Sequence, residues 1–349
     1  MKYKKVGILT FHEADNYGAT LQAYALQNVI SRKANCEIIN YHCKFILSQI
    51  KRIETASLPK RIVAFLFKAK KHIMFARFGR KYLKLSRDFN ESTKREINGL
   101  YDLVFVGSDQ VWNVECTDND KTYFADFIID DTQILSYAAS FGSAPYPQGF
   151  DSLLQRFNTI SLREDKYKEK LEALGKDVRI DIDPTMLLGK EDWSALSRKR
   201  PIQARYVFVY LVGDQVHLLE RAEKYAAENK CKVITNKRSL DFFLHCSPED
   251  FINWIYYADC VFTNSFHGTV FSVILHKKFT VECTLKSGYN NRARNLLGIL
   301  GLENSMLENW DGKENLDWSG IDEKIETMRE ESKQFIYESI EAIEAKRNV

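Results

Sequence analysis

Apolar and polar positions along the chain follow two alternating periods. Short runs of apolar, β-branched and aromatic residues predict buried strands, and apolar residues three or four apart predict amphipathic helices between them. The runs typical of strands cover 6–11, 36–41, 103–106, 134–139, 159–162, 206–212, 232–235 and 260–263. Helical spacing covers 19–31, 217–229, 247–258, 320–345 and a helix that begins at 270–275. Alternating strands and helices are typical of parallel sheets covered by helices, so we expect an α/β fold.

The strand–helix pattern starts again near Tyr206, after a polar, basic connector at 197–201. A chain of 349 residues is long enough for about two domains. We therefore predict two Rossmann-like domains whose parallel sheets face a central cleft, with the boundary between 180 and 202. We assign 1–190 to the N-terminal domain and 191–320 to the C-terminal domain. Residues 321–349 are predicted to form a C-terminal amphipathic helix.

Composition narrows the class of protein. Fifty basic residues face 47 acidic ones, and a net charge of +3 gives no indication of a nucleic-acid partner. No apolar run reaches the roughly 18 residues of a membrane span, and the N-terminus lacks the apolar core of an export signal. The seven cysteines include no C-x-x-C pair, which favours reduced thiols. We expect a cytoplasmic protein.

Two polar stretches in the first half follow predicted strands, where ligands bind in open α/β sheets. In 15–22, Gly18 permits close backbone approach and the exposed N–H groups suit an anion or a sugar oxygen. The alternative there is a plain turn with an Asn or Asp cap. In 106–113, carboxylate and amide groups beside Trp112 are what a sugar-hydroxyl site needs. The alternative is a capped turn with a core tryptophan.

Three further positions could bind an anion. Arg163 follows a predicted strand, and a guanidinium there can hold a carboxylate or phosphate through two contacts; the alternative is a surface ion pair. His267 and Gly268 lie at a strand-to-helix turn, where glycine lets a ligand approach and the helix dipole favours neutral imidazole and nearby anions. The alternative is a satisfied core histidine. Arg292 could reach an anion as well.

Taken together, these stretches are more specific than any one of them. The motifs are Asn-Tyr-Gly-Ala, Val-Gly-Ser-Asp-Gln-Val-Trp, Ser-Tyr-Ala-Ala-Ser-Phe-Gly, Ser-Leu-Arg-Glu, Asp-Pro-Thr-Met-Leu-Leu and Ser-Phe-His-Gly. In this order, from about residue 7 to 302, the chain resembles the polysaccharide pyruvyl transferase family. The resemblance implies a glycosyltransferase-B-like fold. It also implies transfer of a pyruvyl group from phosphoenolpyruvate to sugar hydroxyls of a bacterial exopolysaccharide, a capsule or a lipid-linked precursor, which forms a ketal and releases phosphate.

The resemblance also implies roles for individual residues. His267 would be the general acid or a phosphate contact, and Asp109 would accept the hydroxyl proton of the acceptor. Of the expected donor contacts, Arg163 and Phe266 match the family's pattern, and Ser265, Gly268 and Arg292 are added from their own chemistry and position. The expected acceptor contacts, in the N-terminal domain, come from the polar stretches themselves: Asn16, Tyr17, Gly18, Ser108, Gln110 and Trp112. Many members have an arginine where this chain has Ser265, so one anion contact is lost or is replaced by Arg292. We expect no metal and no cofactor besides the donor phosphoenolpyruvate.

Residues 44–87 have an unusual charge, with thirteen Lys and Arg and one acidic residue, Glu54. Basic and apolar residues interleave within this segment, a pattern that can lie on an anionic membrane surface. We therefore expect peripheral contact with the inner membrane, and the alternative is a helical excursion whose basic face is solvated.

Two other functions share this architecture. A nucleotide-sugar-dependent glycosyltransferase would need a carboxylate for the ribose, and Glu282 could supply it. A non-catalytic glycan-binding protein would bind an oligosaccharide without releasing phosphate. In the pyruvyl transferase interpretation, neither His267 nor Arg163 is expected to be a packing residue.

Overall fold

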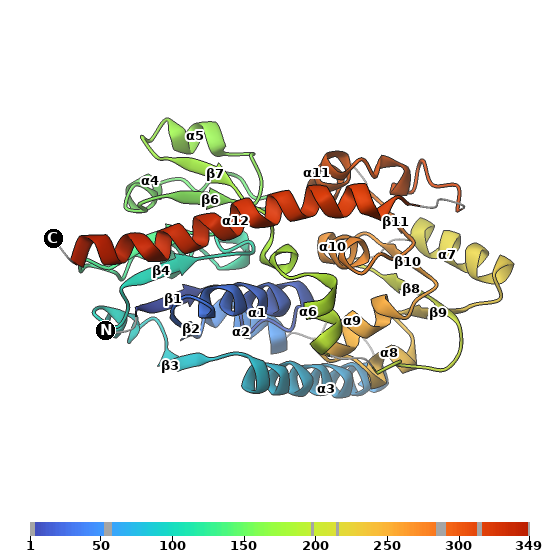
Figure 1. Cartoon of the computed structure of the whole chain (residues 1–349). Coiled ribbons are helices and arrows are strands. Elements are labelled where there is room, and N and C mark those ends of the chain that lie inside the picture. Colours follow the sequence, from blue (N-terminus) through green and yellow to red (C-terminus); the bar gives the residue numbers. More distant parts are fainter. Residues whose placement is uncertain are drawn as a thin grey trace. The chain divides into compact units, whose positions relative to one another are not determined.

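The computed structural model describes residues 4–51, 58–196, 199–213, 216–283, 291–312 and 316–347. These residues form two compact units, each built on parallel strands (Figure 1). The first unit comprises Met1–Leu187 and Met328–Val349, and the second comprises Leu188–Thr327. The predicted α/β fold with two Rossmann-like parallel sheets is confirmed.

The first unit contains a five-stranded sheet in the order β3-β2-β1-β4-β5, with every pair parallel. The strands are β1 (Lys5–Leu9), β2 (Asn35–Tyr41), β3 (Leu85–Phe89), β4 (Leu103–Val106) and β5 (Gln133–Ser136). Two more parallel strands, β6 (Ile160–Leu162) and β7 (Val178–Ile180), continue this arrangement through bridges from 135 to 159 and from 139 to 162. The central strands are buried apolar runs because helices cover both faces of such sheets.

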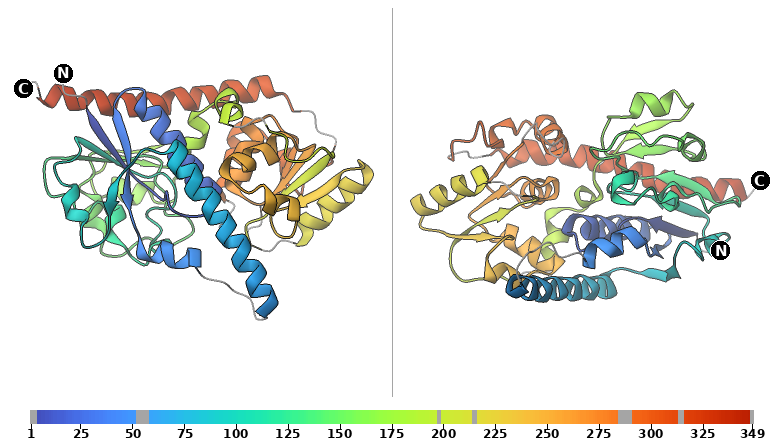
Figure 2. Two further views of the ribbon diagram at one scale, coloured as in Figure 1. Left: turned by 90° about the horizontal axis from the view of Figure 1, so that it is seen from below. Right: turned by 180° about the vertical axis from the view of Figure 1, so that it is seen from behind.

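Helices and 3-10 turns surround this sheet. They are α1 (Tyr17–Ser31), α2 (Lys44–Lys51), α3 (Leu58–Tyr82), η1 (Lys94–Ile97), η2 (Val114–Cys116), η3 (Lys121–Phe124), α4 (Asp151–Leu154), α5 (Lys168–Glu172) and η4 (Pro184–Leu187). The core joins apolar side chains of β1, β2 and β4 to an aromatic group around Trp112 and Phe124. Figure 2 shows α3 as a long blue helix beside α1.

The second unit contains a four-stranded parallel sheet in the order β11-β10-β8-β9. Its strands are β8 (Tyr206–Tyr210), β9 (Lys232–Thr235), β10 (Cys260–Thr263) and β11 (Phe279–Val281). Its helices are α6 (Lys190–Leu196), α7 (Val216–Glu228), α8 (Leu240–Leu244), α9 (Pro248–Tyr256), α10 (Phe266–Ile274) and α11 (Asn291–Leu300), with the 3-10 turn η5 (Glu303–Ser305). The last helix, α12 (Trp318–Arg347), begins in this unit and ends in the first.

Candidate active site

The first unit has a switch point between β1 and β4, where the strand order reverses. Ligands of open α/β sheets bind beyond the carboxyl ends of strands at such points. Asp109 lies there, three residues after β4, with a left-handed backbone (φ 72°). The preceding Ser108 is held by two hydrogen bonds: its Oγ donates to the Ala138 carbonyl at 2.9 Å, and its carbonyl accepts from Thr10 Oγ1 at 3.0 Å. These bonds fix the backbone that presents Asp109.

Arg163 follows β6, and its side chain is only 2% exposed. Its guanidinium lies 2.7 Å from Asp183, 3.4 Å from Asp109 and 3.8 Å from Glu164. Burial alone would lower the pKa of Arg163, but the three carboxylates outweigh that effect and raise the pKa. These surroundings favour a counter-ion role in which Arg163 holds Asp109 in position. The donor contact expected for Arg163 stays a prediction.

The stretch after Asp109 turns into the core. Trp112 is fully buried, its Nε1 donates to the Tyr123 carbonyl at 3.0 Å, and its ring centroid lies 5.2 Å from that of Phe141. The partly buried Gln110 accepts from Asn113 Nδ2 at 2.8 Å. The expected acceptor contact of Trp112 is therefore not available at the surface, because packing places the ring inside the first unit.

The stretch after β1 forms the beginning of α1. Asn16 is exposed and caps this helix, with its Oδ1 accepting from the Ala19 N–H at 3.3 Å. Tyr17 and Gly18 are buried, and the Tyr17 ring packs against Phe75 at 5.0 Å between centroids. Of the three acceptor contacts expected in this stretch, the structure exposes Asn16, while Tyr17 and Gly18 join α1 to the rest of the unit.

A second polar cluster lies near the same carboxyl ends, and our sequence analysis missed it. His12 Nε2 is 2.7 Å from Asn40 Oδ1, and Asn40 Nδ2 donates to Asp88 at 2.7 Å. His42 Nδ1 is 2.5 Å from a carboxylate oxygen of Glu13. The signal that could have found this cluster is position: His12 and Glu13 follow β1, and His42 follows β2.

The second unit has its own switch point between β8 and β10. Two side-chain amides hold the backbone just after β8. Asn236 accepts from the Leu211 N–H and donates to its carbonyl, both at 2.9 Å. Asn264 binds Val212 in the same way, at 2.7 and 2.8 Å. Each amide thus extends the parallel ladder by one pair of hydrogen bonds and makes the segment after β8 a rigid part of this edge.

Ser-Phe-His-Gly forms the beginning of α10, directly after β10. Ser265 is the N-cap, with its Oγ accepting from the Gly268 N–H at 3.3 Å. His267 lies in the first helical turn, half-buried, with its ring centroid 5.3 Å from that of Phe266. The guanidinium of Arg292, from α11, lies over the Phe266 ring at 5.0 Å. A helix N-terminus, an imidazole and a guanidinium around one aromatic ring form a suitable environment for an anion.

The glycine in this turn is required by packing. A Cβ at Gly268 would lie 2.4 Å from Thr263 Oγ1, which donates to the Tyr210 carbonyl at 2.7 Å and accepts from the Ser265 N–H at 3.0 Å. The threonine is thus held in place and cannot yield easily. Gly268 lets α10 begin directly against the end of β10.

We therefore expect Gly268→Ala to lower the free energy of unfolding by about 1–3 kcal/mol, the usual range for overpacking a filled site. Urea unfolding of the purified variant measures this change. Gly298→Ala in α11 is the matched control, because the nearest atom to its new Cβ is 3.9 Å away. The control should be neutral or slightly stabilising, since alanine is the better helix former. Equal stability of both variants would contradict this account of the turn.

Glu282 follows β11 and is 6% exposed. Burial raises the pKa of its carboxyl group, because removal from water disfavours the charged form. Its backbone N–H donates to the Thr263 carbonyl at 3.0 Å, which places it beside the end of β10. The ribose contact considered for Glu282 in the glycosyltransferase alternative stays a prediction.

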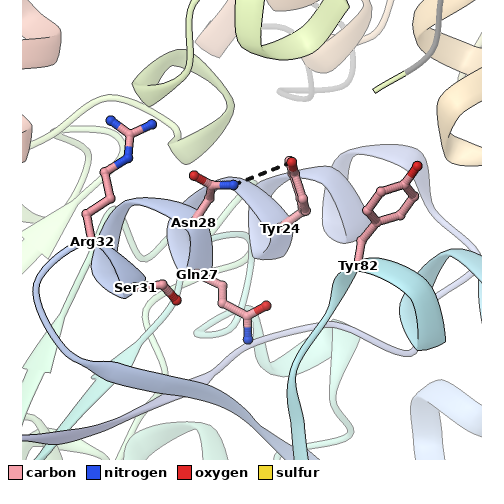
Figure 3. A pocket seen from close by; sticks show the side chains of 6 residues that line it. All are labelled: Tyr24, Gln27, Asn28, Ser31, Arg32 and Tyr82. Carbon is pink, nitrogen blue, oxygen red and sulfur yellow. Dashed lines mark hydrogen bonds between the residues drawn. The ribbon is translucent and has the colours of Figure 1, made fainter. Parts of the chain in front are cut away.

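An open pocket of about 260 Å³ lies elsewhere in the first unit, along the second half of α1 (Figure 3). It is lined by Tyr24, Gln27, Asn28, Ser31, Arg32 and Tyr82. The carboxyl end of β1 leads into the beginning of α1, so this pocket lies toward the opposite end of that helix. Among the described residues, no group of three or more His, Cys, Asp or Glu side chains is arranged to hold a metal ion.

The two parallel sheets with polar carboxyl ends place the protein among the α/β proteins with Rossmann-like units. Residues 16–281 match the family of polysaccharide pyruvyl transferases, so the chain belongs to this family and is a transferase. No curated protein matches the chain in sequence.

Solved structures with similar folds are distant in sequence. A putative UDP-N-acetylglucosamine 2-epimerase from Listeria monocytogenes is 10% identical, with a TM-score of 0.48, over 94% of this chain and 91% of that one. The UDP-GlcNAc 2-epimerase from Neisseria meningitidis bound to UDP-GlcNAc is 10% identical, with a TM-score of 0.43, over 97% and 94%. The E. coli ADP-heptose lps heptosyltransferase II is 9% identical, with a TM-score of 0.33, over 94% and 99%.

Proposed function

We propose that the protein moves the pyruvyl group of phosphoenolpyruvate onto two hydroxyls of one sugar in a bacterial cell-surface polysaccharide or its lipid-linked precursor. The observation that supports this most is the family match, which extends over residues 16–281 and includes parts of both units. The donor supplies the transferred group, so the reaction needs no further cofactor.

The beginning of α10 is the proposed donor site. Phosphoenolpyruvate is a trianion or dianion near neutral pH, and the first turn of α10 offers backbone N–H groups and the positive end of the helix dipole. Arg292, whose guanidinium lies over the Phe266 ring, is the cation that we propose in place of the arginine that many family members have before the Phe-His pair. Ser265 supports this site through its cap on the helix, and Gly268 through the close packing that it permits.

The carboxyl end of β4 is the proposed acceptor site. Asp109 is the base that accepts a sugar hydroxyl proton, and Arg163 is a positioning residue that holds this carboxylate. The exposed Asn16 and the partly buried Gln110 are the polar side chains proposed to contact the sugar. Ser108 contributes through the backbone that it fixes, because its hydroxyl is buried and bonded to a carbonyl.

The proposed chemistry balances without an oxidant or reductant. A proton adds to the methylene carbon of the donor, with His267 as the acid, and C2 becomes electrophilic. The first sugar hydroxyl attacks C2 and gives up its proton to Asp109. The C2–O bond to phosphate breaks, and the second hydroxyl closes the ketal. The two sugar hydroxyls release two protons in total. One makes up for the proton that His267 gave to the methylene carbon, and the other leaves with phosphate.

We also propose that the acceptor is lipid-linked and that the protein works on the cytoplasmic face of the inner membrane, with contact through residues 44–87. The described part of α3 supports this, since it carries several Lys and Arg next to exposed apolar side chains. No helix in the described part of the chain is long and apolar enough to cross a bilayer.

The test is phosphate release from phosphoenolpyruvate in the presence of lipid-linked glycans, with pyruvyl-labelled donor to follow transfer. We expect phosphate and label in equal amounts, and only with the right acceptor. Incorporation of hexose from a nucleotide sugar, with Glu282 needed for donor binding, would favour a glycosyltransferase instead. Glycan binding without phosphate release from any donor would favour a non-catalytic role.

A further inference from the structure

Helix α3 has one face that packs against its own unit. Phe75 and Phe78 are 6% and 1% exposed. The Phe75 ring lies 5.0 Å from Tyr17, and the Phe78 ring lies 6.0 Å from Tyr24, both on α1. Both contacts lie in the second half of the helix. The first half extends past the beginning of α1 (Figures 1 and 2).

The opposite face of α3 is apolar and exposed. Ile62, Leu66 and Ile73 are 54%, 60% and 51% exposed. Spacings of four and seven residues place them on one stripe, while two residues from Ile73 to Phe75 correspond to about 200° and reach the packed face. Val63 and Phe65 are also half exposed or more. Of eleven large apolar side chains exposed in the described part of the chain, five thus lie on this helix.

Charge indicates what covers this stripe. The sequence of α3 contains eight Lys and Arg and no Asp or Glu. Lys70 and Arg77 are four residues beyond Leu66 and Ile73, so they alternate with the apolar stripe on the same side of the helix. A protein partner that covers an apolar stripe would not require eight positive charges on the same helix. An anionic lipid surface satisfies both features, because its headgroups attract Lys and Arg and its acyl chains accept the apolar side chains.

We propose that the exposed face of α3 lies in the interface of an anionic membrane, with Ile62, Leu66 and Ile73 directed toward the acyl chains and Lys70 and Arg77 at headgroup level. This deepens the proposed function, on which it rests, by naming the surface that brings the protein to a lipid-linked acceptor. The opposite face of the helix, with Phe75 and Phe78, then fixes the first unit to this anchor.

The test is co-sedimentation of the full chain with vesicles of 30% phosphatidylglycerol in phosphatidylcholine, beside vesicles of phosphatidylcholine alone. We expect binding to the anionic vesicles that weakens as salt rises, because screening shortens the reach of the surface charge. The triple variant Ile62→Gln, Leu66→Gln, Ile73→Gln should bind at least about tenfold more weakly. Each apolar side chain that enters the membrane interface contributes to the binding free energy. Lys70→Gln with Arg77→Gln should bind about tenfold more weakly and with a smaller salt dependence, because two of the eight basic residues of α3 are removed.

Matched controls separate this effect from a general loss of surface apolarity. Ile129 and Ile299 are 77% and 59% exposed and lie outside α3, so Ile129→Gln with Ile299→Gln should bind vesicles like wild type. All variants should keep a thermal midpoint close to that of wild type, because none of the substituted side chains is buried. Lys68 and Lys71 are unsuitable targets, since Lys68 donates to the Gln49 carbonyl and Lys71 lies over the Tyr17 ring.

Two outcomes would overturn the proposal. One is vesicle binding by the triple variant that equals wild type, or no wild-type binding at all. The other is self-association that the triple variant abolishes, measured by sedimentation velocity without lipid, together with vesicle binding that does not change; the stripe would then face a second copy. Vesicle binding without pyruvyl transfer to any acceptor would leave the membrane contact standing and reject the proposed function alone.

Discussion

Replacing Arg163 with alanine is expected to lower the free energy of unfolding by about 3–5 kcal/mol, the range for removing one partner of a buried ion pair. The guanidinium is 2% exposed and faces Asp183, Asp109 and Glu164. Without it, three carboxylates remain close together in a site with little water, and each must be protonated or moved apart. The cost is that of uncompensated charge, and it exceeds the value of the arginine's own contacts.

Urea unfolding at neutral pH measures this change. The matched control is Lys168→Ala, which removes an exposed pair with Glu172 in the same unit; such pairs contribute about 0.3–0.5 kcal/mol. Arg163→Lys is a second comparison, because lysine keeps the charge but lacks the planar fork that reaches several carboxylates at once. It should lie between wild type and Arg163→Ala. If Arg163→Ala loses no more stability than Lys168→Ala, the counter-ion role of Arg163 is contradicted.

The location of Arg163 was predictable from the sequence, but its role was not. A strand followed by a polar residue indicated the carboxyl end of β6, and the structure agrees. Its partners Asp109 and Asp183 are 54 and 20 residues away, at the ends of other strands. Nothing in the local sequence indicates which strand ends become neighbours, so a buried ion cluster looked like a free cation. The expectation that Arg163 is not a packing residue was wrong for this reason.

The strands that the pattern missed are short or polar. β3 lies at the edge of its sheet and has the sequence LSRDF, with two exposed residues, so it lacks the apolar run of a central strand. β7 and β11 have three residues each, too few for a period to be visible. The beginning of α10 was also placed too late, at 270 in place of Phe266, because the signal there is the cap of Ser265 and not apolar spacing.

Replacing His267 with alanine is expected to lower the turnover of pyruvyl transfer at least about a hundredfold, equal to roughly 2.7 kcal/mol of transition-state stabilisation. The imidazole lies half-buried in the first turn of α10, beside the Phe266 ring. The guanidinium of Arg292 lies over that Phe266 ring. In the proposed reaction a proton must reach the methylene carbon before C2 accepts the sugar hydroxyl. Positioned general acids typically contribute factors of about 10²–10⁴.

His267→Gln distinguishes the two roles considered for this side chain. Glutamine can donate a hydrogen bond to phosphate but cannot deliver a proton to carbon. If the imidazole is the acid, the glutamine variant should be as slow as the alanine variant, with the KM for phosphoenolpyruvate close to wild type. If it only contacts phosphate, glutamine should restore turnover and alanine should raise KM. The control is His217→Ala on α7, whose side chain is 85% exposed and should leave turnover unchanged. Near-wild-type turnover in His267→Ala, with normal folding, would remove this residue from the mechanism and leave protonation of the donor to another group.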